Sequence, residues 1–428
     1  MWRINAKVNE KNTNDSWSRF SIKDVYLALY DGPHATPKPA SEGAVFLGIK
    51  NITEDGKLDL SDIRYISEED FPKWTKRVLP RPGDIVFTYE ATLNRYAIIP
   101  EGFRGCLGRR LALIRPNPEK VDTQFLFYYF FGEEWRKTIA TNLIFGSTVD
   151  RIPLTNFPKF EISLPPLSIQ RKIAAILSAY DDLIENNTRR IEILEEMARS
   201  LYHEWFVNFR FPGHEQVKMV DSEFGLVPEE WEPVKLGNIA QDIRRSINPE
   251  QIDPETPYFG LEHLPRKSIA LSEWGTASQV QSTKLVFHKG EILFGKIRPY
   301  FHKVGVAPVE GVCSSDAIVI KAKTTDYFPI VLACVSSEEF VAHATQTSQG
   351  TKMPRANWDV LVKYPVAIPP LPLLFQFNEF VQNILDQIHN LIFKNRNIRQ
   401  TRDLLLPKLI SGEINVEKFD IKIGKLVA

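Results

Sequence analysis

The sequence has few cysteines and no cluster of metal-binding residues. Its 428 residues include three cysteines and eight histidines, which are scattered rather than placed at the spacing of zinc ligands. An odd, small number of cysteines does not form a disulfide framework and fits a reducing compartment. No apolar run is long enough to span a membrane, and the first residues have no signal-peptide pattern. We therefore expect a soluble, cytoplasmic protein without a metal ion.

The chain also lacks an excess of charge of either sign. Lysine plus arginine and aspartate plus glutamate both number 53, so the net charge is zero. This balance argues against a general polyanion binder, although it is compatible with a locally basic surface. Apolar residues at 43% and charged residues at 25% are ordinary for a globular protein. At this length a single core is not expected, and we predict at least two domains.

Catalytic motifs are missing as well. There is no G-x-x-x-x-G-K-S/T phosphate loop and no G-x-G-x-x-G after a predicted strand. The sequence has no Asn/Asp-Pro-Pro-Tyr/Phe stretch of the kind that holds a target base in amino-methyltransferases. None of the histidines forms a defensible acid–base pair. We therefore expect no catalytic residue and no cofactor bound by this chain.

What the sequence does contain is a long amphipathic stretch, residues 164–206, LPPLSIQRKIAAILSAYDDLIENNTRRIEILEEMARSLYHEWF. A double proline opens it, and no helix breaker follows until Pro212-Gly213. Its apolar positions recur every three or four residues, which predicts a helix with one apolar face. These positions are Ile173, Ile176, Tyr180, Ile184, Ile191, Leu194, Ala198, Leu201 and Trp205.

The same stretch returns 204 positions later, at residues 368–410. Two of its stripe positions are polar, Asn395 and Arg402, and Pro407 is expected to kink or end this helix earlier than the first. One such stretch is usually an ordinary core helix, but two copies in one phase indicate an internal duplication in which the helices form a coiled-coil seam. The other stripe positions are Phe377, Phe380, Ile384, Ile388, Ile398, Leu405 and Leu409.

A region of mixed α+β character precedes each predicted helix. In the first, short apolar runs at 46–49, 84–87, 97–99, 111–114 and 160–164 alternate with turn signals and predict strands, and 124–140 predicts a helix. The second region repeats landmarks of the first in order. We predict an N-terminal arm (1–16), a first domain (17–164), a long helix (165–209), a linker (210–230), a second domain (231–368), a second long helix (369–411) and a tail (412–428).

Cations on the predicted loops are candidates for DNA contact, because arginine and lysine neutralise phosphates and arginine also binds guanine edges. A lone surface cation is usually just solvated, but a set on the loops of a duplicated domain favours a nucleic-acid surface. The candidates are Arg95, Arg104, Arg109 and Arg110 in the first domain and Lys296, Arg298 and Lys303 in the second, together with the aromatic Tyr300 in the same stretch.

Arg151 and Arg355 form a separate pair of candidates. Each follows a glycine by five residues at the entry to the last strand of its domain, with Lys352 close to the second. The equivalent placement fits a phosphate contact on each half of a DNA site, and it fits a structural ion pair equally well.

Taken together, these features resemble the specificity subunit of type I restriction–modification systems. The resemblance is carried by LPPLSIQRKIAAIL (164–177), the helix that continues to Trp205-Phe206, Gly225-x-x-Pro228-x-x-Trp231, IPPLP (368–372) and LLLPKLISGEI (404–414). It covers nearly the whole chain. The second copy departs from the pattern, since it has Leu374 where the first has Gln170.

The resemblance implies two target-recognition domains, each reading one half of a bipartite, asymmetric DNA target. It implies two long antiparallel helices that form a coiled-coil spacer between them, and a subunit without catalysis. Expected partners are double-stranded DNA, two methyltransferase subunits and two restriction subunits, with S-adenosylmethionine, ATP and Mg²⁺ on those partners. Gln170, Trp205 and Phe206 are candidate partner contacts, although a buried coiled-coil role suits Trp205 and Phe206 equally.

Two other hypotheses remain open from the sequence. The chain is then either a coiled-coil assembly scaffold that does not read DNA, or part of a single-chain restriction–modification enzyme. Salt-sensitive, sequence-selective binding to duplex DNA would favour a specificity subunit over the scaffold. Methyl transfer by the isolated chain would identify the single-chain enzyme.

Overall fold

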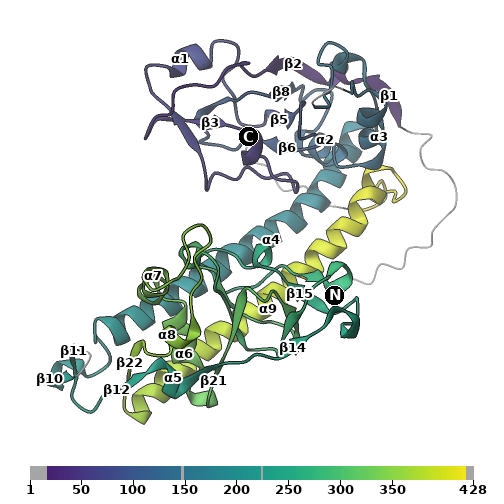
Figure 1. Cartoon of the computed structure of the whole chain (residues 1–428). Coiled ribbons are helices and arrows are strands. Elements are labelled where there is room, and N and C mark those ends of the chain that lie inside the picture. The colour runs from purple at the N-terminus through teal and green to yellow at the C-terminus, as the bar shows by residue number, and fades with distance from the viewer. Residues whose placement is uncertain (1–16, 146–148, 223–224, 421–428) are drawn as a thin grey trace. The chain divides into compact units, whose positions relative to one another are not determined.

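The computed structural model describes residues 17–145, 149–222 and 225–420, and the chain divides into two compact units. Unit 1 comprises Met1–Asp182 and Arg399–Ala428, and unit 2 comprises Leu183–Ile398. The predicted arm (1–16) and the last eight residues of the predicted tail lie outside the described residues. Two long helices, α4 (Leu167–Tyr202) and α9 (Leu371–Ile410), each contribute residues to both units (Figure 1). No helix in the described ranges is long and apolar enough to cross a membrane.

Besides its segments of the two long helices, the described part of unit 1 contains three small sheets and three short α-helices. One sheet has the order β2-β8-β5-β6, another β4-β3-β7, and β1 pairs with β9. The strands are β1 (Ser18–Ser21), β2 (Tyr26–Asp31), β3 (Ala44–Leu47), β4 (Arg64–Ile66), β5 (Ile85–Thr88), β6 (Tyr96–Ile98), β7 (Gly105–Leu107), β8 (Leu111–Pro116) and β9 (Glu161–Leu164), and the helices are α1 (Phe71–Trp74), α2 (Thr123–Tyr129) and α3 (Glu133–Thr141).

Unit 2 repeats this plan with additional strands. Its sheets have the orders β13-β21-β18-β19 and β14-β17-β20-β15-β16, β12 pairs with β22, and β10 and β11 form a hairpin. The strands are β10 (Met219–Ser222), β11 (Gly225–Pro228), β12 (Glu232–Lys235), β13 (Ala240–Asp242), β14 (Ser246–Ile247), β15 (Pro257–Phe259), β16 (Gly275–Thr276), β17 (Lys284–Phe287), β18 (Ile292–Gly295), β19 (Val304–Val306), β20 (Gly311–Cys313), β21 (Ala317–Ala322) and β22 (Pro365–Ile368), and the helices are α5 (Leu236–Ile239), α6 (Phe328–Val335), α7 (Glu338–Gln346) and α8 (Trp358–Leu361).

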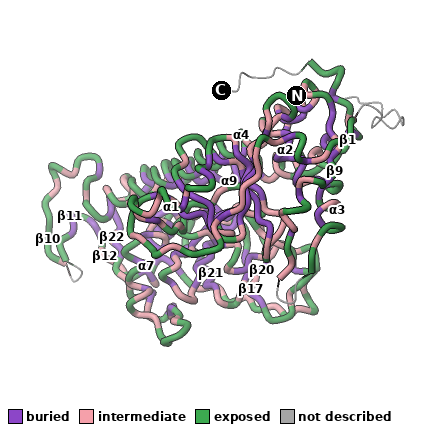
Figure 2. The backbone as a smooth tube through the Cα atoms, turned by 90° about the horizontal axis from the view of Figure 1, so that it is seen from above, coloured by how far each residue is buried: buried purple, intermediate pink, exposed green. Residues whose placement is uncertain are grey.

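The two units share one topology, which confirms the predicted internal repeat. The four-stranded sheets correspond strand by strand, and even the pairing register is kept: Ile85 faces Ile114 in unit 1, and Ile292 faces Ile320 in unit 2. Each unit also contains one parallel pair, β3–β7 and β15–β20. The central strands are buried on both faces, whereas the β10–β11 hairpin is largely exposed (Figure 2).

Three local expectations were wrong. The helix predicted at 124–140 is two helices, because residues 130–132 interrupt it between α2 and α3, with Gly132 as the residue that precedes α3. Pro407 does not end the second helix early. It lies in the last turn of α9, which continues to Ile410, whereas α4 ends at Tyr202 in a wide π turn, His203–Val207. Phe380 is half exposed rather than on the buried stripe.

The polar positions of the second stripe have partners on α4. In unit 2, Asn187 Nδ2 donates to Asn395 Oδ1 at 2.9 Å, and both residues are buried. In unit 1, Arg402 donates to Asp181, which also accepts a 2.6 Å hydrogen bond from Tyr128. Within unit 2, Trp205 near the end of α4 contacts Phe377 near the start of α9, so the two helices run in opposite directions there. Buried polar groups of this kind fix register, because any shift leaves them without partners.

We predict that Asn395→Ala lowers the free energy of unfolding of unit 2 by about 1–3 kcal/mol, because the Asn187 amide then stays buried without its partner. Urea denaturation of the full chain measures this. The matched control is the double substitution Asn187→Leu with Asn395→Leu, which removes both polar groups and should be nearly neutral. A single substitution that costs no more than the double one would contradict this role of the pair.

Candidate nucleic-acid interface

In unit 1, three chain segments meet at the end of strand β5. The β5–β6 loop, the turn before β8 and the segment entering the last strand are joined by backbone bonds: Tyr89 N donates to Arg110 O at 3.2 Å, and Ile152 N donates to Tyr89 O at 2.7 Å. Glu90 and Arg151 form an isolated β-bridge. We call residues 88–96, 108–110 and 150–152 the first loop site.

The equivalent segments meet in unit 2. Lys296 N donates to Asp316 O at 2.9 Å, Arg298 N donates to Pro354 O at 2.7 Å, and Ile297 and Arg355 form an isolated β-bridge. We call residues 295–303, 314–316 and 354–356 the second loop site. Because the same backbone connections recur, the two loop sites are the same structural feature in two copies.

The side chains of the two loop sites differ, and one equivalent position is even occupied by residues of opposite charge. Sheet register places Arg110 and Asp316 at equivalent positions, four residues before Ile114 and Ile320. Arg110 Nε lies 3.0 Å from Glu90 Oε1, whereas Asp316 accepts from Arg355 Nε at 3.2 Å. The scaffold is thus retained while the exposed chemistry is changed.

This geometry separates Arg151 from Arg355, which the sequence treated alike. Arg355 takes part in the Asp316 ion pair, with its side chain 48% exposed. Arg151 is exposed and has no ion pair among the described residues. Of the two residues, Arg355 therefore forms the ion pair that was one of the two alternatives. A phosphate contact by either arginine stays a prediction.

Most other first-domain candidates are already paired. Arg95 donates to Ile52 O and to Glu54, Arg104 forms a two-bond pair with Glu68, and Arg110 pairs with Glu90. The bonds to Glu68 raise the pKa of Arg104. Arg109 is exposed, and the described residues offer it no ion pair.

In the second domain, the β18–β19 loop gathers four candidates, although they differ in accessibility. Tyr300 is exposed, with its ring 4.9 Å from that of Phe301. Lys303 donates to Leu261 O, and burial lowers its pKa. Arg298 Nε is buried without a hydrogen-bond partner among the described residues. The backbone of Lys296 is bonded on both sides, and Lys352 is exposed on the neighbouring segment.

Sequence reasoning missed the backbone conformation of these loops. Ala91 and Asn94 in the first loop site, and Arg298 and His302 in the second, have φ between +49° and +70°. Left-handed non-glycine residues are strained and occur often at functional sites. Asparagine and histidine adopt this conformation more often than most residues, so Asn94 and His302 carry a weak sequence signal, whereas Ala91 and Arg298 carry none.

The three candidate partner contacts lie inside the fold. Gln170 is 2% exposed, accepts from Asp122 N and donates to Pro165 O. Trp205 and Phe206 are buried in the core of unit 2, where Phe206 packs on Phe377 with ring centroids 4.7 Å apart. The structure buries all three side chains within the fold, and a partner contact by any of them stays a prediction.

Known proteins share both the sequence pattern and the fold. The family model described as "Type I restriction modification DNA specificity domain" matches residues 14–196 and again 228–401. The specificity subunit of the type I restriction enzyme MjaIX of Methanocaldococcus jannaschii is 26% identical over 372 residues, covering 83% of each chain. That of EcoDI from Escherichia coli is 25% identical over 329 residues, covering 70% of this chain and 72% of the relative.

Among solved structures, the S subunit of a type I restriction–modification system from M. genitalium has the same fold. Its TM-score is 0.54 at 15% sequence identity, covering 95% of this chain and 98% of that one. The family model matches one copy of the repeat after the other and together spans most of the chain. The chain therefore belongs to the family of type I restriction-modification DNA specificity proteins.

Proposed function

We propose that this chain is the non-catalytic specificity subunit of a type I restriction–modification complex, and that each unit reads one half of a bipartite DNA target. Family membership supports the DNA-recognition role. The observation that carries the bipartite reading is the pair of equivalent loop sites with unlike side chains. The shared backbone places a loop site in each unit, and different side chains on the two loop sites would then select different bases.

The long helices would serve as an antiparallel coiled-coil spacer that sets the distance between the half-sites. Apolar residues of both helices support this role, since Ile191 on α4 belongs to one buried cluster with Ile384, Ile388 and Leu391 on α9. In a symmetric DNA-binding dimer, the protein geometry determines half-site spacing. A duplicated single chain would apply the same rule to two unlike half-sites.

In this proposal the chemistry belongs to partner subunits. Two methyltransferase subunits would supply S-adenosylmethionine-dependent methylation, and two restriction subunits would supply ATP- and Mg²⁺-dependent cleavage. The zero net charge of this chain fits a subunit whose affinity for DNA depends partly on basic partners, because phosphate contacts dominate affinity.

Selection from random duplexes tests the proposal directly. The chain co-purified with a methyltransferase subunit from the same source should recover two unlike short motifs separated by a fixed gap. A single contiguous motif would contradict the two-domain reading. No enrichment by an intact complex would favour an assembly scaffold instead.

For Arg298 we predict a base contact in the half-site of unit 2. Arg298→Ala should relax selectivity at one base pair by about 1–3 kcal/mol, because a bidentate contact to guanine is lost. The measurement is binding to duplexes with single-base changes in the selected motif. Arg298→Lys is the matched control, since it keeps the charge but not the planar fork. Uniform weakening on all sequences, rescued by Arg298→Lys, would instead mean a phosphate contact.

The spacer role makes a separate prediction. Adding one helical turn to α4 and to α9 at facing positions should change the preferred gap and leave both half-site sequences unchanged, because the helices set distance and the loops read bases. Selection with the lengthened chain measures both quantities at once. An unchanged gap would exclude the spacer role.

A further inference from the structure

The β18–β19 loop of unit 2 is held in a strained conformation. A 3-10 turn, Pro299–Phe301, lies between two left-handed non-glycine residues, Arg298 at φ +49° and His302 at φ +51°. Such residues persist only where surrounding contacts compensate for the strain. Phe301 N donates to Arg298 O at 2.9 Å and His302 N donates to Pro299 O at 2.8 Å, so the turn links the two left-handed residues directly.

His302 is fixed through its ring and its backbone. The ring is buried, and its Nε2–H donates to Ser336 O at 2.9 Å. Its carbonyl accepts from Lys267 N at 2.8 Å, and Lys267 is itself left-handed, at φ +56°. Beside this bond, the Arg266 guanidinium lies 4.3 Å from the centre of the Phe301 ring. The loop thus depends on the segment around Lys267.

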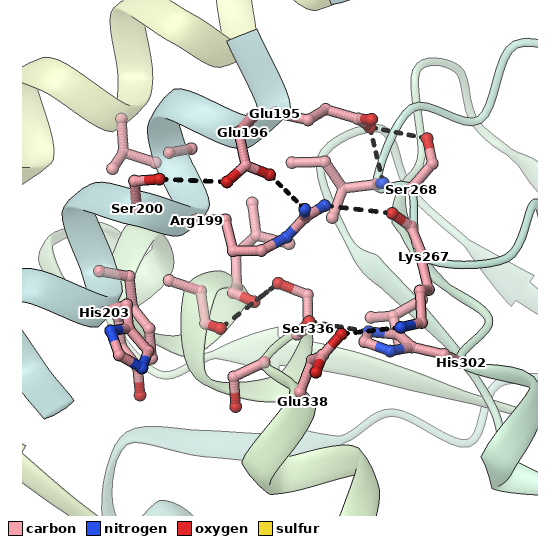
Figure 3. Close-up of a pocket in the computed structure, with 18 of the residues that line it drawn as sticks. Glu195, Glu196, Arg199, Ser200, His203, Lys267, Ser268, His302, Ser336 and Glu338 are labelled. Atoms are coloured by element: carbon pink, nitrogen blue, oxygen red, sulfur yellow. Dashed lines mark hydrogen bonds and ion pairs between the residues drawn. The ribbon is translucent and has the colours of Figure 1, made fainter. Parts of the chain in front are cut away.

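Helix α4 holds that segment in turn. Arg199 donates to Lys267 O at 3.2 Å. Glu195 Oε1 accepts hydrogen bonds from Ser268 Oγ at 2.7 Å and Ile269 N at 2.8 Å (Figure 3), and a third from Ala270 N at 2.9 Å. Burial raises the pKa of Glu195 despite these donors. Burying a carboxylate is unfavourable unless hydrogen bonds compensate, and here three donors meet one oxygen. Glu195 therefore fixes the segment 268–270 to α4.

These contacts line a cavity of about 380 Å³ whose walls come from α4, the 267–269 segment, His302 and the residues around Ser336. Figure 3 shows Glu195 and Arg199 reaching from α4 toward Ser268 and Lys267, with His302 beyond. All of these residues belong to unit 2. A continuous path of hydrogen bonds therefore joins α4 to the β18–β19 loop.

The first loop site is fastened only in part like the second. Arg95, the residue after left-handed Asn94, donates to Ile52 O at 3.2 Å and to Glu54 at 2.9 Å, as Lys303, the residue after left-handed His302, donates to Leu261 O. Asn94 Oδ1 accepts from Tyr96 OH at 3.3 Å. These bonds stay within the recognition domain itself. Among the described hydrogen bonds of the two loop sites, the second loop site alone adds a link to α4 through Lys267.

We infer that Glu195, Arg199 and His302 are positioning residues for DNA reading by unit 2, because they transmit the position of α4 to the loop that carries Arg298. The inference rests on the proposed DNA-reading function. It assigns a role in specificity to α4 residues that lie outside the predicted DNA-contacting set.

The test uses the full chain co-purified with its methyltransferase, the selected duplex and single-base variants of each half-site. Glu195→Ala, Arg199→Ala and His302→Ala should each lower discrimination about tenfold in the half-site that Arg298→Ala identifies, as when a bidentate base contact is lost. Discrimination in the other half-site should not change, which provides an internal control. Glu195→Gln keeps an acceptor oxygen and should restore most of the loss.

Glu192→Gln, an exposed acid one turn earlier on α4, is the matched control and should leave both half-sites unchanged. Thermal unfolding checks that each variant is folded. If His302→Ala unfolds, the exposed Arg199 side chain still provides the test. Unchanged discrimination in folded Glu195→Ala and Arg199→Ala, or an equal loss in both half-sites, would overturn the inference. Absence of any selected motif with the unmodified chain would instead overturn the proposed function.

Discussion

Burial of the apolar faces of α4 and α9 is the constraint on which the rest of the structure depends. Neither recognition domain completes its core alone. In unit 1, Leu409 and Ile410 from the end of α9 join the cluster that contains Leu177 of α4. In unit 2, Phe206 just beyond α4 packs on Phe377 of α9. Full burial of one such side chain contributes about 1.5–3 kcal/mol. Each unit is therefore stabilised by residues far away in sequence, and the boundaries of the folded units do not coincide with the ends of the repeats.

The two units keep the same backbone positions for certain buried residues, but different segments supply the residues that pair with them. A buried acid follows the same turn in both copies, Asp84 in one and Glu291 in the other, and each forms two hydrogen bonds with an arginine. The arginine comes from strand β8 in unit 1 (Arg115) and from the segment after β13 in unit 2 (Arg245). A buried carboxylate without a partner is strongly destabilising, so each unit must supply an arginine to this acid. The acid does not determine which segment of the chain supplies that arginine. The exposed side chains of the two loop sites do not have to compensate for a buried carboxylate.

The sequence alone predicted the features that have a period or a repeat. Two long helices, most strands of the first domain and the duplication follow from apolar spacing and shared landmarks, since burial imposes that spacing. The loop sites were only partly predictable. Arg95, Arg104 and Arg110 looked like free cations, but Glu54, Glu68 and Glu90 lie beside them in space and not in a recognisable pattern. The left-handed conformation of Arg298 has no local signal, because it depends on contacts with distant residues such as Pro354.

The different fastening of the two loops has a consequence for how the chain can change its specificity. The first loop is held by Arg95 through bonds inside its own domain, so that domain carries both the loop and its support. The second loop is likewise held inside its domain by Lys303, which donates to Leu261 O, but it is also held through Lys267 by Arg199 and Glu195, which belong to the helix preceding the domain. Substitutions on α4 can therefore alter the second loop site without touching a base-reading residue, whereas the first loop site has no such dependence through the described bonds of Arg95. The functional border of the second recognition domain thus includes the last turns of α4, although the repeat places them in the long helix.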